Sequence, residues 1–164
     1  MSRLILVLGR SGQIATELVR TPTPAGFALE AWGRDRLDLS DPQTAAATVA
    51  ALKPAVVINA AAYTMVDKAE LDPVSAFTIN RDAPAAIARI CAELGAPFIH
   101  ISSDYVFDGT KSDPYLETDP RNPVSVYGRS KAEGENEVVA SAADASIIRT
   151  SWVYAAHGSN FLRT

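Results

Sequence analysis

Short apolar runs alternate along the chain with longer segments that show helical spacing of apolar positions. The run Leu4–Leu8 contains no polar residue, which is typical of a strand buried on both faces of a sheet. Similar runs predict four further strands, at Phe27–Trp32, Val56–Ile58, Phe98–Ile101 and Ser146–Arg149.

Helix signals fill the segments between these runs. Gln13–Arg20 follows the first strand as a helix, and Ser40 or Asp41 can cap a second one that ends near Leu52. Pro42 suits the first turn of that helix, where its missing N–H costs nothing.

A second cap followed by proline, Asp72-Pro73, begins a longer helical stretch that Gly95 ends. Pro84 lies inside this stretch and is expected to break it into two pieces. The last predicted helix covers residues 125–140.

Strands and helices that alternate at this spacing form parallel sheets through right-handed crossovers. We therefore predict an α/β fold, a Rossmann-type doubly wound parallel sheet with helices on both faces, in one domain over residues 1–164. The polar segment from Asp104 to Pro123 is longer than most connections, which indicates a functional loop.

Composition narrows the class of protein and its partners. Apolar residues make up 48% and charged residues 21%, which predicts neither disorder nor a membrane protein. The net charge of −4 argues against nucleic acid or an anionic membrane surface as a partner. No cleavable leader follows Met1 and Cys91 is the single cysteine, so we expect a cytoplasmic location. With only His100 and His157 besides, no metal site is predicted, and these three are expected to be structural.

The first predicted strand leads into Gly9-Arg10-Ser11-Gly12-Gln13-Ile14-Ala15, and a helix follows. Glycines at such a turn let the backbone approach a diphosphate, whose charge then lies at the helix N-terminus. A turn of this kind can be purely structural. Its place after the first strand of an alternating fold favours a dinucleotide site at Gly9 and Gly12.

The second predicted strand ends at Trp32-Gly33-Arg34, where dinucleotide folds distinguish the two nicotinamide cofactors. An acid there holds a ribose 2′-hydroxyl, and a base accepts a 2′-phosphate. Arg34 therefore favours NADPH, with a solvated surface arginine as the alternative. Asp38 and Leu39 follow closely enough to meet the adenine edge, although the spacing does not demand it.

A serine, a tyrosine and a lysine carry the candidate chemistry. Ser103 follows the fourth predicted strand, at the sheet edge where open α/β folds bind ligands. Tyr127 and Lys131 stand four residues apart, so on a helix they share a face. A neighbouring ammonium is expected to lower the phenol pKa, and phenol and serine hydroxyl together can serve a carbonyl that receives a hydride. A tyrosine and a lysine at this spacing are common on surface helices by chance. Here the pair follows the glycine turn and the serine along the chain, and this order favours a catalytic role.

With these residues in place, the chain resembles the extended short-chain dehydrogenase/reductases, and among them the dTDP-4-dehydrorhamnose reductase family. The resemblance rests on blocks that occur in family order: Gly9-x-x-Gly12-Gln13, Asn59–Glu70, Ser102–Gly109, Tyr115–Asp119, Pro123 with Val126–Lys131, and Arg149–Tyr154.

The resemblance implies reduction of dTDP-4-dehydro-L-rhamnose by NADPH or NADH, in a protein that can form homodimers, some with Mg²⁺ at the interface. Tyr127 would donate the proton, Lys131 would hold the nicotinamide ribose, and Ser103, Asp104 and Trp152 would contact the dTDP-sugar. The family usually has threonine where this chain has Ser103. The cofactor would be lined by Gly12, Gln13, Ile14, Asp38, Leu39, Ala62, Tyr63 and Thr64. The family also carries a C-terminal substrate lobe, which is absent from these 164 residues.

Two alternatives stay open. One is another extended-family enzyme, such as a nucleotide-sugar epimerase or dehydratase; a dehydratase would favour additional acid–base carboxylates, and Asp104 is a candidate. A non-catalytic NADP-binding regulatory subunit would lack the Tyr127–Lys131 pair, which is present. The block Arg149–Tyr154 favours the reductase over the first alternative.

Overall fold

The computed structural model describes residues 2–141, 143–158 and 160–162. Within these residues, five parallel strands form one sheet in the order β2-β1-β3-β4-β5. The strands are β1 (Arg3–Leu8), β2 (Phe27–Trp32), β3 (Val56–Asn59), β4 (Phe98–Ser103) and β5 (Ala145–Thr150). All of the predicted strands are present, and all but β2 extend one or two residues beyond the predicted bounds.

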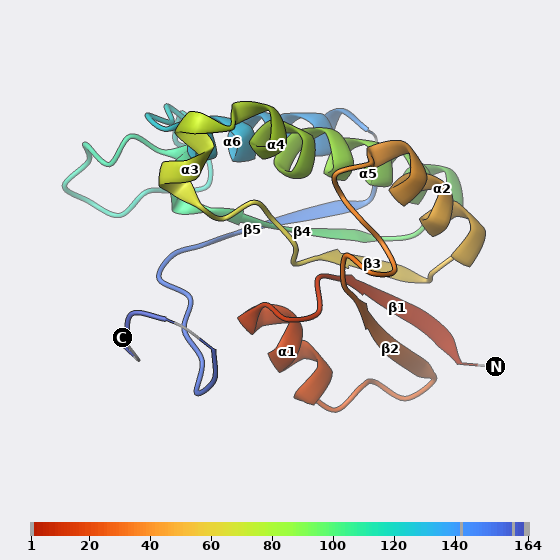
Figure 1. Cartoon of the computed structure of the whole chain (residues 1–164). Coiled ribbons are helices and arrows are strands. Elements are labelled where there is room, and N and C mark those ends of the chain that lie inside the picture. The colour runs from red at the N-terminus through yellow and green to blue at the C-terminus, as the bar shows by residue number, and fades with distance from the viewer. Residues whose placement is uncertain (1, 142, 159, 163–164) are drawn as a thin grey trace.

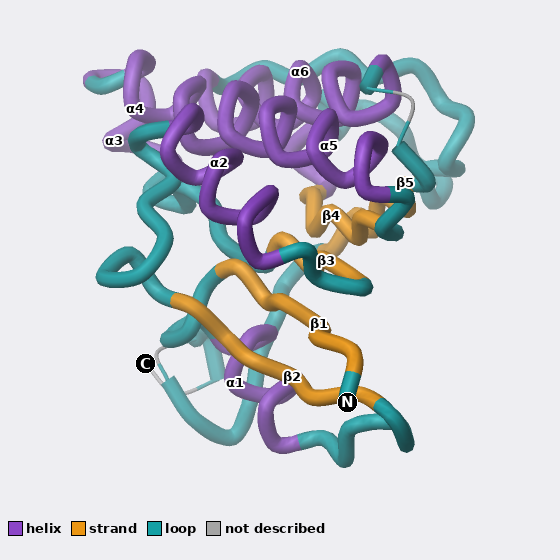
Figure 2. Tube along the Cα trace, turned by 90° about the vertical axis from the view of Figure 1, so that its right-hand side faces the viewer, coloured by secondary structure: helices purple, strands orange, loops and turns teal. Residues whose placement is uncertain are grey.

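Helices cover both faces of the sheet, as predicted (Figure 1). The helix α1 (Gln13–Arg20) lies on one face with the segment that follows β5, and Figure 2 shows it below β1 and β2. The larger layer on the other face contains α2 (Pro42–Leu52), α3 (Val66–Leu71), α4 (Pro73–Phe77), α5 (Ala83–Leu94) and α6 (Val126–Ala140). The predicted doubly wound Rossmann-type architecture is therefore confirmed.

The main core lies between the sheet and the larger helical layer. Leu8 of β1, Phe98 of β4 and Ile87 of α5 pack there with almost no exposed surface. Because successive side chains of a strand alternate between faces, His100 and Ser102 point to the same side as Phe98 and are also buried. This face of β4 thus passes from an apolar to a polar environment as the strand approaches its carboxyl end.

Capping side chains begin three of the helices. Asp41, Asp72 and Ser125 each accept a hydrogen bond from the backbone N–H three residues further on, at 3.0–3.1 Å. Of the two predicted caps for α2, the structure therefore selects Asp41. Gly95 ends α5 in the left-handed conformation, as the pattern predicts.

The helical stretch before β4 differs from its prediction. The sequence pattern indicates no helix at α3, because Met65 offers no side-chain cap before the first turn. The predicted break at Pro84 is wrong: the stretch continues from α4 through a π-helical turn, η1 (Thr78–Asp82), into α5. In η1 the Ala83 N–H donates to the Thr78 carbonyl, five residues back instead of four.

This wider turn places the Asn80 backbone against α6. Pro84 has no N–H to offer the Asn80 carbonyl four residues before it. That carbonyl packs onto Gly134, where an added Cβ would overlap it. A proline and a glycine far apart in the sequence therefore cooperate in one close helix contact.

No helix formed by the described residues combines the length and the apolar character needed to cross a membrane.

Candidate active site

Two adjoining cavities lie at the carboxyl ends of the strands, on either side of the loop that follows β3. The larger cavity has a volume of about 830 Å³ and the smaller about 430 Å³, and Ala61, Ala62 and Thr64 line both. Predicted site residues of the larger cavity are Gly9, Arg34, Asp38, Leu39, Ala62, Tyr63 and Thr64. Those of the smaller cavity are Gly12, Gln13, Ile14, Ala62, Thr64, Ser103, Asp104, Tyr127, Lys131 and Trp152. The fold thus brings all of the predicted site residues to one crevice, and their individual roles remain predictions.

The glycine turn between β1 and α1 forms the junction of the two cavities. Gly9 has φ +101°, and a Cβ there would lie 3.3 Å from the Ala61 nitrogen. A side chain at this position would meet both an unfavourable backbone conformation and the neighbouring loop. Gly12, in contrast, has no atom of the described chain within 4 Å of its ideal Cβ position apart from its own sequence neighbours, and it gives α1 no side-chain cap. The helix N-terminus therefore faces open space that an anion can occupy.

Exposed cations surround the larger cavity. Arg34 pairs with Asp38 at 3.6 Å, and its side chain is 75% exposed. Arg10, on the glycine turn, pairs with Asp35 at 3.1 Å and lies beside Gly33 at the end of β2. Arg10 is not among the predicted site residues, because its proximity to the end of β2 depends on the packing of two separate loops. Lys68 of α3 also lines the cavity and was singled out only within a family block.

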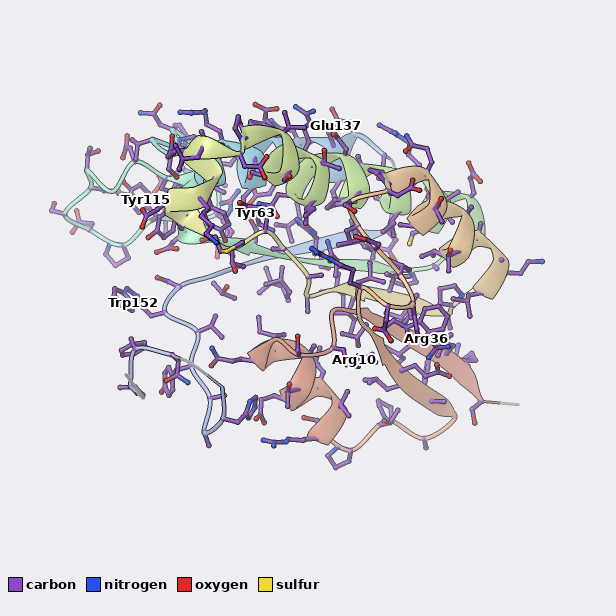
Figure 3. All side chains as sticks on the ribbon, in the orientation of Figure 1. Arg10, Arg36, Tyr63, Tyr115, Glu137 and Trp152 are labelled. Carbon is purple, nitrogen blue, oxygen red and sulfur yellow. The ribbon has the colours of Figure 1, made fainter. Side chains whose placement is uncertain are left out.

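Asn80 of η1 holds the backbone of Tyr63, which forms part of the wall of the larger cavity. Its side-chain oxygen accepts from the Tyr63 N–H at 2.8 Å, and its amide nitrogen donates to the Tyr63 carbonyl at 3.0 Å. The same amide donates to Ser130 Oγ on α6 at 2.9 Å. Figure 3 shows Tyr63 on the loop after β3, between the sheet and the larger helical layer. The π-helical turn therefore holds the cavity wall in register with the helix that carries Tyr127 and Lys131.

A chain of hydroxyl and carboxylate groups lines the smaller cavity. Ser103 Oγ donates to one oxygen of Asp104 at 3.0 Å, and Ser151 Oγ donates to the other at 2.6 Å. The Tyr105 ring meets the Tyr127 ring edge-on, with centroids 5.4 Å apart. Ser151 was not predicted as a site residue, although it lies in the block Arg149–Tyr154 that supports the family resemblance. Its hydroxyl holds the Asp104 carboxylate beside the predicted proton donor.

Trp152 lies on the exposed segment after β5 (Figure 3). It has φ +52°, which is uncommon for a bulky residue, and it is 73% exposed. Its ring meets Phe161 edge-on at a centroid distance of 5.1 Å. A strained backbone that presents a large aromatic surface at a cavity mouth is typical of a ligand contact.

The predicted lowering of the Tyr127 pKa is wrong for this structure. Burial raises the pKa of Tyr127, nearby Asp104 and Tyr105 add to the increase, and hydrogen bonding with Ser103 acts in the opposite direction. Lys131 does not supply the expected effect, because its Nζ donates instead to the Ile101 carbonyl at 2.7 Å. At neutral pH the phenol therefore keeps its proton.

Lys131 is itself buried, with 1% of its surface exposed. Burial lowers its pKa to about 8, against a smaller opposing effect of Glu135. The imidazole of His100 lies on its other side, with Nε2 3.4 Å from Nζ. Neutral and charged forms of this lysine therefore both occur close to physiological pH.

Glu135 anchors the region beneath the smaller cavity. It accepts hydrogen bonds from Ser102 Oγ at 2.5 Å, from Arg149 at 2.7 and 3.0 Å, and from Arg121 at 2.9 Å. Burial favours the neutral acid, but these donors and cations outweigh it and lower the pKa of Glu135. The carboxylate thus ties α6 to β4, to β5 and to the long loop that contains Arg121. Within the described residues, no three His, Cys, Asp or Glu side chains are grouped to hold a metal ion.

Comparison with known proteins identifies the family. The profile of the RmlD substrate binding domain matches residues 2–164. The chain belongs to this family. A dTDP-4-dehydrorhamnose reductase of Burkholderia thailandensis is 49% identical over 98% of this chain and 53% of that protein. One of Escherichia coli K12 is 44% identical over 98% of this chain and 54% of that protein.

Solved structures agree with this assignment. The crystal structure of a dTDP-4-dehydrorhamnose reductase from Bacillus anthracis in complex with NADP superposes with a TM-score of 0.92 at 31% identity. It covers 99% of this chain and 58% of the solved one. A UDP-glucose 4-epimerase from Brucella ovis shares only the fold, at 21% identity and a TM-score of 0.76. The chain spans about half the length of the curated relatives it matches.

Proposed function

We propose that this chain is the cofactor-binding and catalytic half of a dTDP-4-dehydrorhamnose reductase. The reaction converts dTDP-4-dehydro-L-rhamnose to dTDP-L-rhamnose by hydride transfer from NADPH. The supporting observation is that Ser103, Tyr127 and Lys131 line a cavity whose other wall is the glycine turn. The names of relatives that are 44–49% identical point to the same substrate.

The crevice fits a nicotinamide dinucleotide. The uncapped N-terminus of α1 faces the open space beside Gly12, which suits the diphosphate. The larger cavity suits the adenosine, with Arg34 and Arg10 near the end of β2 for a 2′-phosphate. Lys131 and Tyr127 then lie in the smaller cavity with the nicotinamide end. NADPH is favoured over NADH because both candidate contacts at the 2′ position are cations.

When bound, NADPH would supply the hydride that reduces the carbonyl of the sugar. Tyr127, protonated at neutral pH, donates its proton to the carbonyl oxygen, and Ser103 holds that oxygen by a hydrogen bond once its single O–H turns away from Asp104. In the free site the Asp104 carboxylate accepts from both Ser103 and Ser151. Lys131, whose Nζ donates to the Ile101 carbonyl in the free site, binds the nicotinamide ribose, and a hydroxyl of that ribose or a water passes a proton from Lys131 to the Tyr127 oxygen. Trp152 presents its ring to the sugar at the open side of the smaller cavity.

A turnover assay tests this function. NADPH oxidation is followed by absorbance, with dTDP-4-dehydro-L-rhamnose as the substrate, and dTDP-L-rhamnose is identified as the product. The assay compares this chain alone with a joined protein that carries the C-terminal half of the Burkholderia thailandensis relative. Turnover is expected in the joined protein. Interconversion of the sugar without net NADPH consumption would instead indicate an epimerase, and binding without either reaction a regulatory subunit.

Cofactor binding has a separate test in the chain alone. Gly12→Val places a branched side chain in the space assigned to the diphosphate, where, among the described residues other than the chain neighbours, no atom lies within 4 Å of the Cβ position. The variant should therefore fold, with an unchanged thermal transition, and lose NADPH binding in calorimetric titration. Gly26→Ala lies away from both cavities and serves as the control for binding: its φ of +83° is unfavourable for alanine, so the thermal transition should fall while NADPH affinity stays unchanged. Unchanged affinity in Gly12→Val would remove the glycine turn from the proposed site.

The same proposal places the reaction in the cytoplasm, where nucleotide sugars and reduced cofactors are available, and the buried free thiol of Cys91 agrees with a reducing compartment. A homodimer remains a prediction. Magnesium is not part of the proposal.

A further inference from the structure

The buried imidazole of His100 lies in a network that the proposed mechanism does not use. Asn59 and His100 are directly paired across β3 and β4, and both side chains are buried on the face of the sheet that the larger helical layer covers. Asn59 Nδ2 lies 3.1 Å from His100 Nδ1, and His100 Nε2 lies 3.4 Å from Lys131 Nζ. The network therefore runs from the loop after β3 to the lysine of the smaller cavity.

A backbone donor decides the orientation of the Asn59 amide. The Ala61 N–H donates to Asn59 Oδ1 at 3.2 Å, and a backbone N–H can only donate. The NH₂ group of Asn59 must then face His100 and donate to Nδ1. An imidazole nitrogen that accepts carries no proton, so the neutral ring of His100 carries its proton on Nε2.

The ring of His100 remains neutral across the physiological range. Burial, with a further contribution from the charge of Lys131, lowers its pKa well below the ordinary value. The Nε2–H consequently points at Lys131 Nζ. An ammonium group has only donors and cannot accept this proton, whereas a neutral amine has a lone pair that can.

We propose that Asn59 and His100 set the protonation balance of Lys131, by holding an Nε2–H donor against its amino group so that the neutral amine is favoured. His100 is thus a positioning residue for the reaction, and this role rests on the proposed function. When Tyr127 has given its proton to the substrate, the Lys131 ammonium gives a proton to a water or ribose hydroxyl between the two groups. That hydroxyl gives a proton in turn to the phenolate, so the phenol O–H forms again. The neutral amine that results is the form that His100 stabilises, and a proton from solvent recharges it.

Other charged groups around α6 are engaged elsewhere. Glu135, one turn along the helix, favours the ammonium form but is held by Arg121, Arg149 and Ser102. Groups that approach α6 from the remaining elements have partners at other positions of the helix: Glu70 at Val126, Arg81 at Glu133 and Arg89 at Glu137. The titratable groups left at the mouth of the smaller cavity are Asp104, Tyr105 and Tyr127.

Side-chain NMR of this chain tests the proposal without cofactor or substrate. The chain has two histidines and four lysines, so Lys131→Met and His100→Gln assign the two resonances of interest. The ¹⁵N shifts of His100 should report a neutral ring protonated at Nε2. His100→Gln offers an amide oxygen that can accept from the ammonium, and should raise the pKa of Lys131 from about 8 by about one pH unit.

Two further variants separate hydrogen bonding from packing. Asn59→Asp presents oxygen to both of its partners, so it should move the His100 proton to Nδ1 and raise the pKa of Lys131. Phe98→Leu disturbs the ring that stacks on His100, at 6.0 Å between centroids, and leaves the hydrogen bonds in place. It should not change the pKa of Lys131.

A parent ring protonated at Nδ1 would overturn the proposal. So would a Lys131 pKa that stays the same in both His100→Gln and Asn59→Asp, or that moves equally in Phe98→Leu. Because none of these measurements involves turnover, the proposal can fail while the reductase assignment stands. An inactive joined protein, in turn, would leave the NMR result intact.

Discussion

The two cavities of the crevice differ in how far their charged groups are exposed to solvent. Around the larger cavity the charged residues are exposed: the side chains of the Arg10–Asp35 pair are 59% and 54% accessible. At the smaller cavity Lys131 is buried, as is Glu135 beneath it, at 1% or less, while Asp104 and Ser151 are exposed at its mouth. Exposed charges are screened by water and contribute little each, whereas buried ones are strong and need defined partners.

This difference indicates a division of tasks. A nucleotide can be held by backbone shape and a few mobile cations, so the larger cavity tolerates changes in its side chains. Proton transfer requires groups whose pKa is displaced by burial, and these must be satisfied on every side. Substitutions at the smaller cavity should therefore have larger effects than matched substitutions at the larger one.

The largest effect is expected at Tyr127. Tyr127→Phe keeps the ring and its contact with Tyr105 but removes the proton donor. Turnover of the joined protein should fall by about 10²–10⁴-fold, the usual contribution of general acid catalysis, with cofactor affinity preserved. Tyr63→Phe, in the larger cavity, is the matched control and should retain most of the activity. Near-parental turnover in Tyr127→Phe would reassign the acid, and Asp104 would be the next candidate.

A stability measurement compares the ion pairs of the two regions. Glu135→Gln leaves Arg149 and Arg121 without their buried carboxylate, and should lower the free energy of unfolding by about 2–3 kcal/mol. This is less than for a fully buried pair, because both arginines are partly exposed. Asp35→Asn breaks the exposed pair with Arg10 and should cost about 0–1 kcal/mol. Denaturant unfolding checks both values, and equal losses would contradict the distinction.

The same carboxylate gives this comparison a pH dependence. The pKa of Glu135 is lowered in the folded chain, so the folded state binds fewer protons than the unfolded state as the pH falls. Its contribution to stability is present above the ordinary glutamate pKa and disappears as the pH falls through the lowered one. The difference in stability between the parent and Glu135→Gln should therefore shrink in acid.

A smaller effect is expected at Arg34. Loss of an exposed charge-assisted contact in Arg34→Ala should weaken NADPH binding by about tenfold, or about 1.4 kcal/mol, and leave NADH binding nearly unchanged. Arg10→Ala should likewise weaken NADPH binding and leave NADH binding nearly unchanged. Arg36→Ala is the matched control, because neither Arg36 nor its partner Glu30 lines the cavity, although Arg36 stacks on Trp32, which does. Equal losses for both cofactors would make Arg34 a general surface charge.

Much of this organisation could be predicted from the sequence. Local signals suffice for the strands, because a short run without polar residues, such as Leu4–Leu8, is typical of a buried strand. They suffice also for capped helices, since Asp41 and Ser125 act on backbone groups only three residues away. The helix α3 has no such start signal, and its place is decided by packing against α6.

The protonation states of the site residues could not be predicted as well from the sequence. Spacing places Tyr127 and Lys131 on one helical face, but the Lys131 amino group turns toward a β4 carbonyl. Whether a neighbouring charge or burial dominates a pKa depends on such three-dimensional detail. His100 is one of two histidines in the sequence, and only the register of β3 with β4 pairs it with Asn59. The π-helical turn likewise depends on Gly134 of α6, whose missing side chain leaves room for the Asn80 carbonyl.

The smallest effect is expected from Ser103→Thr, which restores the residue usual in the family. Ser103 has extended backbone angles, φ −142° and ψ 155°, which a β-branched residue adopts readily. The hydroxyl would keep its two short-range contacts, donating to Asp104 and accepting from the Tyr105 N–H. Turnover of the joined protein should therefore stay within about twofold of the parent, a difference of about 0.4 kcal/mol. Ser103→Ala removes the hydroxyl at the same position and should reduce turnover by more than Ser103→Thr and by less than Tyr127→Phe. If Ser103→Thr were as damaging as Ser103→Ala, the added methyl group would be the cause, and the smaller cavity would be too tightly packed at this point to accept the residue found in its relatives.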